Sequence, residues 1–302
     1  MNQLLQDFIK PGIVHFMIHP ECMGGEGPVV ETVRALAEDP FLEVLEITTI
    51  VDAGARRAVV DICEQARVEL TFGAQPILLG GGLDINSADE ERRSAAVAAV
   101  KGGIDQAQEM GIQDVALLSG TVCDDFEEGK QRLIASLKEL CAHARPHGIN
   151  IVLETFDTVP FGKNCLIGPT KEAVQVSETI RGEFPGFGLI LDLSHLPLLG
   201  ETSRDAIAEA GDHLVHLHIG NCAMDDADHP AHGDNHPRFG APGTRNDVSE
   251  LTEFLRVLLD TGYLNENERK TISFEVRPMS GEEPSAVLAG SKRTLVEAWR
   301  NI

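Results

Sequence analysis

The segments INIVLETF (149–156), PTKEAVQVSETIR (169–181) and FGLILDLSH (187–195) decide the fold. The first and third are short apolar runs, which is typical of strands buried in a parallel sheet. The middle segment carries apolar residues at helical spacing. A strand, a helix and a second strand in this order indicate a βαβ unit with parallel strands.

The same alternation continues in both directions along the chain. We expect further strands at 12–18, 41–50, 68–75, 112–119, 213–221 and 271–278, and further helices at 28–39, 53–67, 88–110, 125–147, 203–211, 247–262 and 282–302. Each strand is thus followed by a helix, and eight such units close into a barrel. We therefore predict an α/β fold, a single-domain (β/α)₈ TIM barrel over residues 1–302.

A doubly wound open sheet is the alternative architecture. It would need a glycine-rich phosphate-binding turn after an early strand. The segments MGGEG (23–27) and LGGGLD (79–84) fit that pattern poorly. We expect the triglycine at 80–82 to lie in a flexible loop on the catalytic face.

Composition excludes several classes of function. The formal net charge of −23 argues against nucleic-acid binding, which depends on Lys and Arg contacts to phosphates. The six cysteines form no C-x-x-C pair, as expected for reduced thiols in a cytoplasmic protein. We find no signal-peptide pattern and no apolar run of about 18 residues, so we expect no membrane association.

The polar segment 221–246 is longer than most connections between a strand and a helix. It follows the seventh predicted strand and therefore lies on the catalytic face of the barrel. It contains His229, His232 and His236. We interpret it as a lid-like loop that places His236 over a substrate, with a solvated, mobile loop as the alternative.

Four consecutive predicted strands end in residues of types that can bind a metal ion. Strands five to eight end near Glu154, Asp192, His218 and Glu275, and catalytic residues of such barrels come from these strand ends. His216 shares a face with His218 but lies deeper in the barrel. Three carboxylates and one imidazole suit Mn²⁺ first, or Mg²⁺, with Co²⁺ and Zn²⁺ as alternatives. Two glutamates beside such an ion could remove and return a proton next to a carbonyl.

The motifs HGINIVLET (147–155), LDLSH (191–195), VHLHIGN (215–221) and SFEVRP (273–278) resemble the xylose isomerase-like TIM barrel superfamily. This superfamily includes sugar phosphate isomerases, ketose 3-epimerases and family 2 apurinic (AP) endonucleases. The resemblance to the epimerases implies that Glu154, Asp192, His218 and Glu275 bind the metal. It also implies that Glu154 and Glu275 act as acid and base.

The resemblance further implies substrate contacts. The histidine three residues after the metal-binding aspartate binds substrate oxygens in the epimerases, which makes His195 a catalytic and substrate-binding candidate. A basic residue of the loop after strand seven often contacts substrate there, and Arg238 occupies such a position. Arg277 follows Glu275 on the same strand face, and His236 is the candidate from the lid-like loop.

Several functions remain open beside a sugar isomerase or epimerase. The segments HIGNC (218–222) and HPAHGDNHPRFG (229–240) resemble the catalytic alpha subunits of C-glycoside deglycosidases, lyases that cleave 3-oxo-glucosides by β-elimination and work with a smaller beta subunit. Asp234 and His236 match an endonuclease element, but strands two and three lack the histidines of that branch. A sugar-binding barrel without activity is a third alternative. We expect a small-molecule sugar or oxo-glycoside as substrate, and a homo-oligomer or a beta subunit remains open.

Overall fold

A computed structural model describes residues 4–158 and 160–302, and its eight parallel strands form a closed barrel in chain order. Strand β8 pairs with β1, which closes the ring. The predicted (β/α)₈ barrel is therefore confirmed. The strands are β1 (Ile9–Val14), β2 (Val44–Ile47), β3 (Glu69–Gly73), β4 (Asp114–Leu118), β5 (Asn150–Glu154), β6 (Gly188–Asp192), β7 (Leu214–Gly220) and β8 (Lys270–Glu275).

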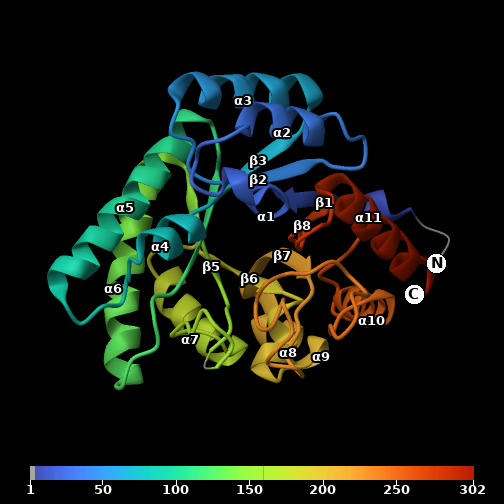
Figure 1. Ribbon diagram of the computed structural model, residues 1–302. Coiled ribbons are helices and arrows are strands. Elements are labelled where there is room, and N and C mark those ends of the chain that lie inside the picture. The colour runs from blue at the N-terminus through green and yellow to red at the C-terminus, as the bar shows by residue number, and fades with distance from the viewer. Residues whose placement is uncertain (1–3, 159) are drawn as a thin grey trace.

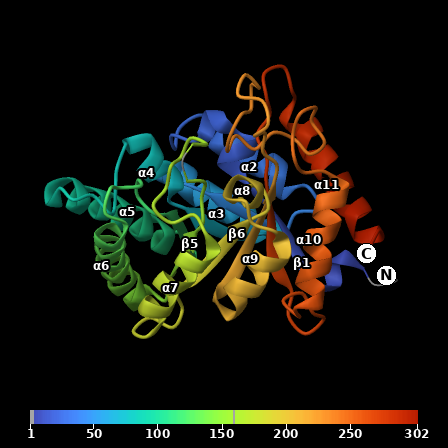
Figure 2. The same ribbon diagram turned by 90° about the horizontal axis from the view of Figure 1, so that it is seen from below.

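Helices surround the barrel on all sides, as Figures 1 and 2 show, with α10 and α11 packed side by side. The outer helices are α2 (Val29–Ala37), α3 (Ala53–Ala66), α5 (Glu90–Glu109), α6 (Phe126–Ala144), α7 (Thr170–Arg181), α9 (Ser203–Ala210), α10 (Val248–Asp260) and α11 (Pro284–Arg300). Aspartate side chains cap the first turns of α3, α5 and α6, as the free N–H groups there require. Within the described residues, no helix is long and apolar enough to cross a membrane.

Alternation along the strands separates two layers of core. Leu117, Leu153 and Leu191 are fully buried in the main core cluster between strands and helices. Val152 and Ile190 belong to a separate cluster inside the barrel. Because side chains alternate along a strand, the residues two positions further on in β5 and β6 also face the interior. Those residues are the carboxylates at the ends of the two strands.

The segment 15–18, predicted to end the first strand, instead forms the short helix α1 (His15–Ile18). The β1–β2 register ends with Val14 opposite Glu46, so the chain beyond has no strand partner. A helical turn satisfies the backbone there, and the His19 N–H donates to the His15 carbonyl. The predicted strand start was also late, because β1 begins at Ile9 and includes Pro11.

The triglycine at 80–82 ends a helix and does not lie in the loop that the sequence had led us to expect. Gln75–Gly81 form helix α4, which ends at Gly82 in the left-handed conformation. Pro76 starts this helix well because its fixed φ suits the first turn. The remaining short elements are α8 (His195–Leu199) and the 3₁₀ helices Leu5–Asp7, Pro20–Cys22, Arg145–His147 and Gly211–His213. His195 therefore opens a helix and does not end a strand.

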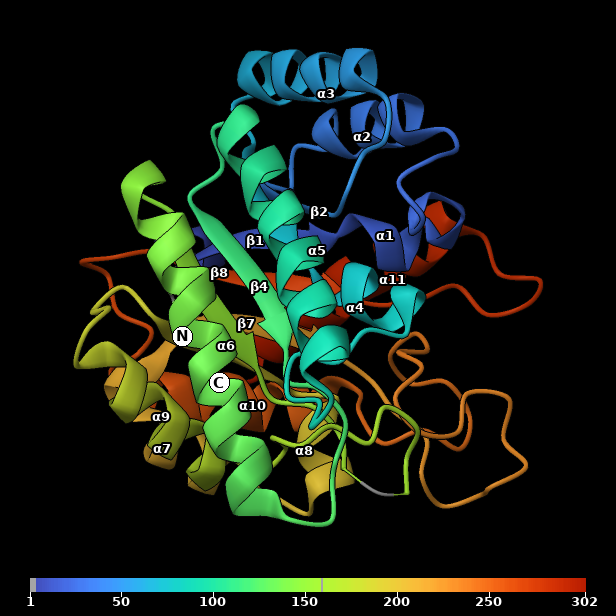
Figure 3. The same ribbon diagram turned by 90° about the vertical axis from the view of Figure 1, so that its left-hand side faces the viewer.

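Figure 3 views the barrel from the side. The short helices α1 and α4 lie at one end of the barrel, and the loop after β7 and the segment after β8 extend at the same end. This is the end at which the parallel strands terminate, so the loops and the strand-end carboxylates share one face.

Candidate metal and substrate site

The structure brings together the four predicted metal-binding residues at the ends of β5 to β8. Glu154, Asp192, His218 and Glu275 are all buried, and one ligand atom of each lies within 4.8 Å of the others. Parallel pairing explains the convergence, because Asp192 lies opposite His218 and Glu275 lies opposite Gly220. The strand ends therefore present three carboxylates and one imidazole to a single point.

The Nδ1 atom of His218 lies at the centre of the cluster. It is 3.0 Å from Oε1 of Glu154 and 2.8 Å from Oε2 of Glu275. The Oε2 atom of Glu275 nevertheless makes no hydrogen bond among the described residues. Nδ1 is thus at hydrogen-bond distance from Glu154, whereas its close contact with Glu275 lacks hydrogen-bond geometry, as expected for two ligands of a shared cation.

Burial and charge also fit a cation. Carboxylates buried side by side are costly unless they are paired or bind a metal. Burial is the main reason that the pKa of Asp192 is raised, and the neighbouring Glu275 adds to it. Although burial acts in the opposite direction, Glu46, Glu154 and Glu275 raise the pKa of His218 well above its ordinary value. The oxygen-rich donor set with one imidazole fits a divalent ion of the Mn²⁺ or Mg²⁺ type.

A second buried cluster adjoins these residues and centres on Asp234. Its Oδ1 atom lies 3.1 Å from Nε2 of His195 and 2.7 Å from Nε2 of His236. Its Oδ2 atom accepts from Nζ of Lys163 at 2.8 Å. Although burial alone would lower it, Asp234 raises the pKa of His236 to about 9 and that of His195 well above its ordinary range. The cluster therefore holds cationic side chains beside the carboxylates.

His195 is held at both ring nitrogens. Its Nδ1 lies 2.7 Å from the Thr155 carbonyl, which can only accept, so Nδ1 donates there. Its Nε2 faces Asp234 at 3.1 Å and Asp192 at 3.8 Å. The ring of Phe156 packs against it with 4.6 Å between centroids. These contacts fix His195 between the metal-binding residues and the second cluster.

The loop 221–246 is folded down onto the barrel at its base. The side chain of Asn221 donates to the Arg238 carbonyl and accepts from the N–H groups of Cys222 and Asn246. Asn246 donates in turn to the carbonyls of Leu193 and Gly220. We call this pair of asparagines the neck of the loop. Within this loop Asp234 and His236 are buried, so this part of it is not solvated.

Gly220 permits the close approach of this segment. A Cβ at Gly220 would lie 2.6 Å from the carbonyl oxygen of Glu275 and 3.0 Å from Nδ1 of His236. His236 itself has a φ of 50°, in the left-handed region. A glycine at the end of β7 is therefore required for His236 to reach the cluster.

The other two histidines of the loop do not reach the site. Nε2 of His229 lies 3.0 Å from the Pro242 carbonyl, and Nδ1 of His232 lies 2.9 Å from the Asp226 carbonyl. These contacts are internal to the loop. His229 and His232 thus stabilise the loop's own conformation.

A pocket of about 760 Å³ opens above the clusters. Its polar lining includes Thr48, Thr49, Gln75, Lys163, Asp234, Asn235, His236, Glu275 and Arg277. Its other wall includes the apolar side chains of Phe16, Met17, Met23, Ile77, Leu79 and Phe156. Arg277 therefore lies where a substrate would bind. Arg238 does not line this pocket, because its Nε donates to Glu282 at 2.8 Å, and its contact with substrate stays a prediction.

Asp234 had been noted only as part of an endonuclease element, and three further residues at the site were not among the predicted ones. Gln75 donates from Nε2 to Oε2 of Glu154 at 2.7 Å, and Lys163 pairs with Asp234. Glu46 accepts from both His216 and His218. Glu46 could have been recognised from the sequence, because it lies near the end of the second strand, as the four predicted residues lie near the ends of theirs. Gln75 ended the segment 68–75 that was expected to be a strand, but it begins helix α4, and Lys163 lies in a loop, where neither periodicity nor spacing indicates a position.

The family model described as "Xylose isomerase-like TIM barrel" matches residues 39–294, which is most of the chain. The chain belongs to the xylose isomerase-like TIM barrel family. This confirms the resemblance seen in the strand-end motifs. A search of curated proteins found no match.

Solved structures of this fold include several sugar epimerases. An L-ribulose 3-epimerase matches with a TM-score of 0.71 at 17% identity, covering 97% of this chain and 96% of that one. A D-psicose 3-epimerase from Clostridium cellulolyticum H10, determined with D-tagatose, gives 0.69 at 18% identity, with coverage of 97% and 98%. The 3-keto-D-glucoside 4-epimerase YcjR from E. coli gives 0.67 at 16%, with coverage of 97% and 99%. At these identities the likeness shows the fold.

Proposed function

We propose that this protein is a divalent-metal-dependent carbohydrate enzyme that removes a proton next to a sugar carbonyl, as sugar isomerases and epimerases do. The observation that carries the proposal is that two buried glutamates, Glu154 and Glu275, lie 3.0 and 2.8 Å from the His218 Nδ1 atom. The epimerase names of the structural neighbours support the reaction class.

Glu154, Asp192, His218 and Glu275 would hold the metal, for which we propose Mn²⁺. A bound divalent ion would polarise the sugar oxygens and acidify the adjacent C–H. Glu275 lines the pocket and is placed to exchange a proton with a substrate there. Gln75 holds Oε2 of Glu154 at 2.7 Å, which leaves the orientation of that carboxylate fixed.

The cationic cluster would bind the sugar oxygens. His236, Lys163 and Arg277 all line the pocket beside Glu275. The ring nitrogens of His195 lie 4.0 Å from Oε1 of Glu154 and 3.8 Å from Oδ2 of Asp192. His195 would orient a substrate hydroxyl or stabilise charge that develops on a substrate oxygen. His195 and His236 are buried, and preorganised donors of this kind need no rearrangement during the reaction.

Deuterium exchange tests this function directly. We expect the Mn²⁺-loaded protein, in D₂O with a panel of free ketoses, to place deuterium at one carbon and to yield an isomeric sugar, both read by NMR. The same panel with the metal-free protein is the control. An absence of exchange from every sugar and oxo-glycoside offered would contradict the proposal.

A lyase that acts on oxo-glucosides by β-elimination is the second candidate, and the apolar wall of the pocket favours it. A volume of about 760 Å³ with an apolar side suits a sugar that carries an apolar group. The first step is the same, because proton removal beside the oxo group precedes loss of the aglycone. In this case a smaller beta subunit would be the partner, and an aglycone would be released.

Substitution of Leu79 distinguishes the isomerase from the lyase. Leu79 is 42% exposed and lines the pocket, so we expect Leu79→Ser to fold normally. If the substrate carries an apolar aglycone, the KM for an aryl 3-oxo-glucoside rises about tenfold, because roughly 1.4 kcal/mol of apolar contact is lost. The KM for a free ketose does not change. Val122→Ser, at a site 41% exposed and outside this pocket, is the matched control. Equal KM values for wild type and Leu79→Ser with the aryl glucoside would contradict a role of this wall.

A further inference from the structure

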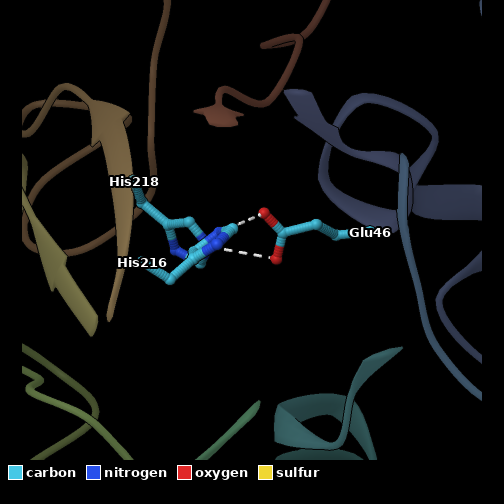
Figure 4. Close-up of side chains that lie close together, drawn as sticks. All are labelled: Glu46, His216 and His218. Atoms are coloured by element: carbon cyan, nitrogen blue, oxygen red, sulfur yellow. Dashed lines mark hydrogen bonds and ion pairs between the residues drawn. The ribbon is translucent and has the colours of Figure 1, made fainter. Parts of the chain in front are cut away.

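A buried group of three side chains lies on the side of His218 that faces away from the carboxylate cluster. Figure 4 shows the carboxylate of Glu46, from β2, pointing at the rings of His216 and His218, from β7. Nε2 of His216 lies 2.7 Å from Oε1 of Glu46, and Nε2 of His218 lies 3.1 Å from Oε2. One carboxylate thus engages both histidines across the barrel interior.

The two ring nitrogens of His218 therefore face different partners. Nε2 meets Glu46, whereas Nδ1 meets Glu154 and Glu275. Carboxylates thus face both nitrogens, and an ionised carboxylate can only accept a hydrogen bond. An ion held by the four metal-binding residues would take the lone pair of Nδ1, so the single proton of a neutral His218 would lie on Nε2 and be donated to Glu46. The lone pair on Nδ1 then points to the place where the ligand atoms of the four metal-binding residues converge.

Glu46 is itself held in place by His216. The rings of His216 and His218 stand at 90° with 5.1 Å between their centroids, so the two N–H groups approach different oxygens of one carboxylate. His216 and Glu46 border a cavity of about 350 Å³ that is also lined by Thr71 and Thr271. The side chain of Glu46 is only 4% exposed, which leaves it little freedom to turn away.

We propose that Glu46, supported by His216, is a positioning residue of the metal site that fixes His218 with its proton on Nε2 and its Nδ1 lone pair toward the ion. This inference rests on the metal site of the proposed function. Carboxylates that hold the far nitrogen of a metal-binding histidine orient the ring and raise its basicity. A series of contacts thus links Glu46 of β2, through His218, to the carboxylates at the ends of β5 and β8.

A separate cation held by Glu46, His216 and His218 is the competing interpretation, since their ligand atoms also lie within 4.8 Å of one another. Both carboxylate oxygens are already at hydrogen-bond distance from a ring nitrogen. A second ion would also require His218 to bind metals through both nitrogens. The number of ions bound per chain distinguishes the two arrangements.

Manganese binding without any sugar tests the inference. Mn²⁺ would be titrated into the metal-free full-length protein, with the free ion followed by electron paramagnetic resonance. We expect one ion per chain, and we expect Glu46→Gln to raise the Kd about 10- to 100-fold. His216→Leu should raise it less, and His216→Gln, which retains an N–H donor, should restore most of the affinity. Thr71→Val is the matched control, because its hydroxyl borders the same cavity and makes no hydrogen bond among the described residues.

A spectroscopic measurement separates positioning from a general loss of structure. With Zn²⁺ bound to protein labelled with ¹⁵N-histidine, long-range NMR correlations should show His218 protonated on Nε2 in the wild type and in Thr71→Val. Glu46→Gln should change this pattern while the thermal melting of the metal-free protein shows it folded. If Glu46→Gln fails to fold, the Kd for Mn²⁺ and the His218 NMR pattern of His216→Leu and His216→Gln test the inference instead.

Three results would overturn the inference: an unchanged Kd in Glu46→Gln or in His216→Leu, a His218 protonated on Nδ1, or two ions per chain. A wild type that binds no Mn²⁺ would overturn it together with the metal site. A wild type that binds Mn²⁺ but exchanges no sugar proton would contradict the proposed function and leave this inference standing.

Discussion

Replacing Glu154 or Glu275 with glutamine is expected to lower kcat by about 10³-fold, within the range for loss of a general acid or base. Glutamine keeps the size of the side chain and an oxygen that can bind a metal, but it cannot accept the substrate proton. The measurement is the rate of deuterium exchange and product formation at saturating Mn²⁺, with substrate binding followed by calorimetry. Binding should persist while turnover is lost.

Two controls make this result specific. Glu268 lies just before β8, and its exposed carboxylate pairs with Lys270. The activity of the Glu268→Gln variant should equal that of the wild type. Raising the Mn²⁺ concentration separates the two roles of each glutamate, because excess metal can compensate for a weakened ligand and not for a missing base. Full activity of either variant at high Mn²⁺ would show that its carboxylate moves no proton.

Removal of the metal is expected to have the second large effect. After chelation, activity should disappear and return on addition of Mn²⁺, since polarisation of the substrate would be lost. The free energy of unfolding should also fall, by about 2.7 kcal/mol relative to protein held at 100 times the Kd for the ion. The physical reason is that three buried carboxylates then lose the charge that compensates them. Thermal melting of metal-free and Mn²⁺-loaded protein measures the difference.

The choice of metal can be read in the same experiment. The chelated protein would be reloaded in turn with Mn²⁺, Mg²⁺, Co²⁺ and Zn²⁺, and the activity and melting temperature compared. We expect Mn²⁺ to restore the highest activity, because three carboxylates and one imidazole form a set of mainly hard ligands. Identical melting and activity with and without chelation would mean that the cluster is held by hydrogen bonds alone.

The barrel and the four strand-end residues could be predicted because two simple periodicities locate them. Helical and strand spacing identified the eight units, the ends of strands five and six indicated Glu154 and Asp192, and the period of two along strand seven placed His216 and His218 on one face. The parallel register then aligned the ends of neighbouring strands, so Asp192 came to lie opposite His218. None of these steps required knowledge of a side chain far away in the sequence.

The parts that could not be predicted depend on contacts between distant segments. Lys163 reaches Asp234 across 71 positions of the chain, and Gln75 reaches Glu154 across 79. The apolar segment at 15–18 has the composition of a strand, yet it forms a helix because its neighbour β2 is already finished. Arg238 occupies the loop position that the resemblance indicated, but its pairing with Glu282 depends on the segment after β8.

The asparagine neck of the β7–α10 loop separates the conformation of the loop tip from that of the barrel. Asn221 and Asn246 tie the two ends of the loop to each other and to the ends of β6 and β7. The tip beyond the neck includes His229 and His232, whose hydrogen bonds stay within the loop, although the ring of His232 also lies 5.9 Å from that of Phe161. A tip of different length would cost little loop-closure entropy and would leave the strand register intact. We therefore expect the part of the loop around His229 and His232 to tolerate changes in length, provided that Asp234 and His236 of the same loop stay in the buried cluster.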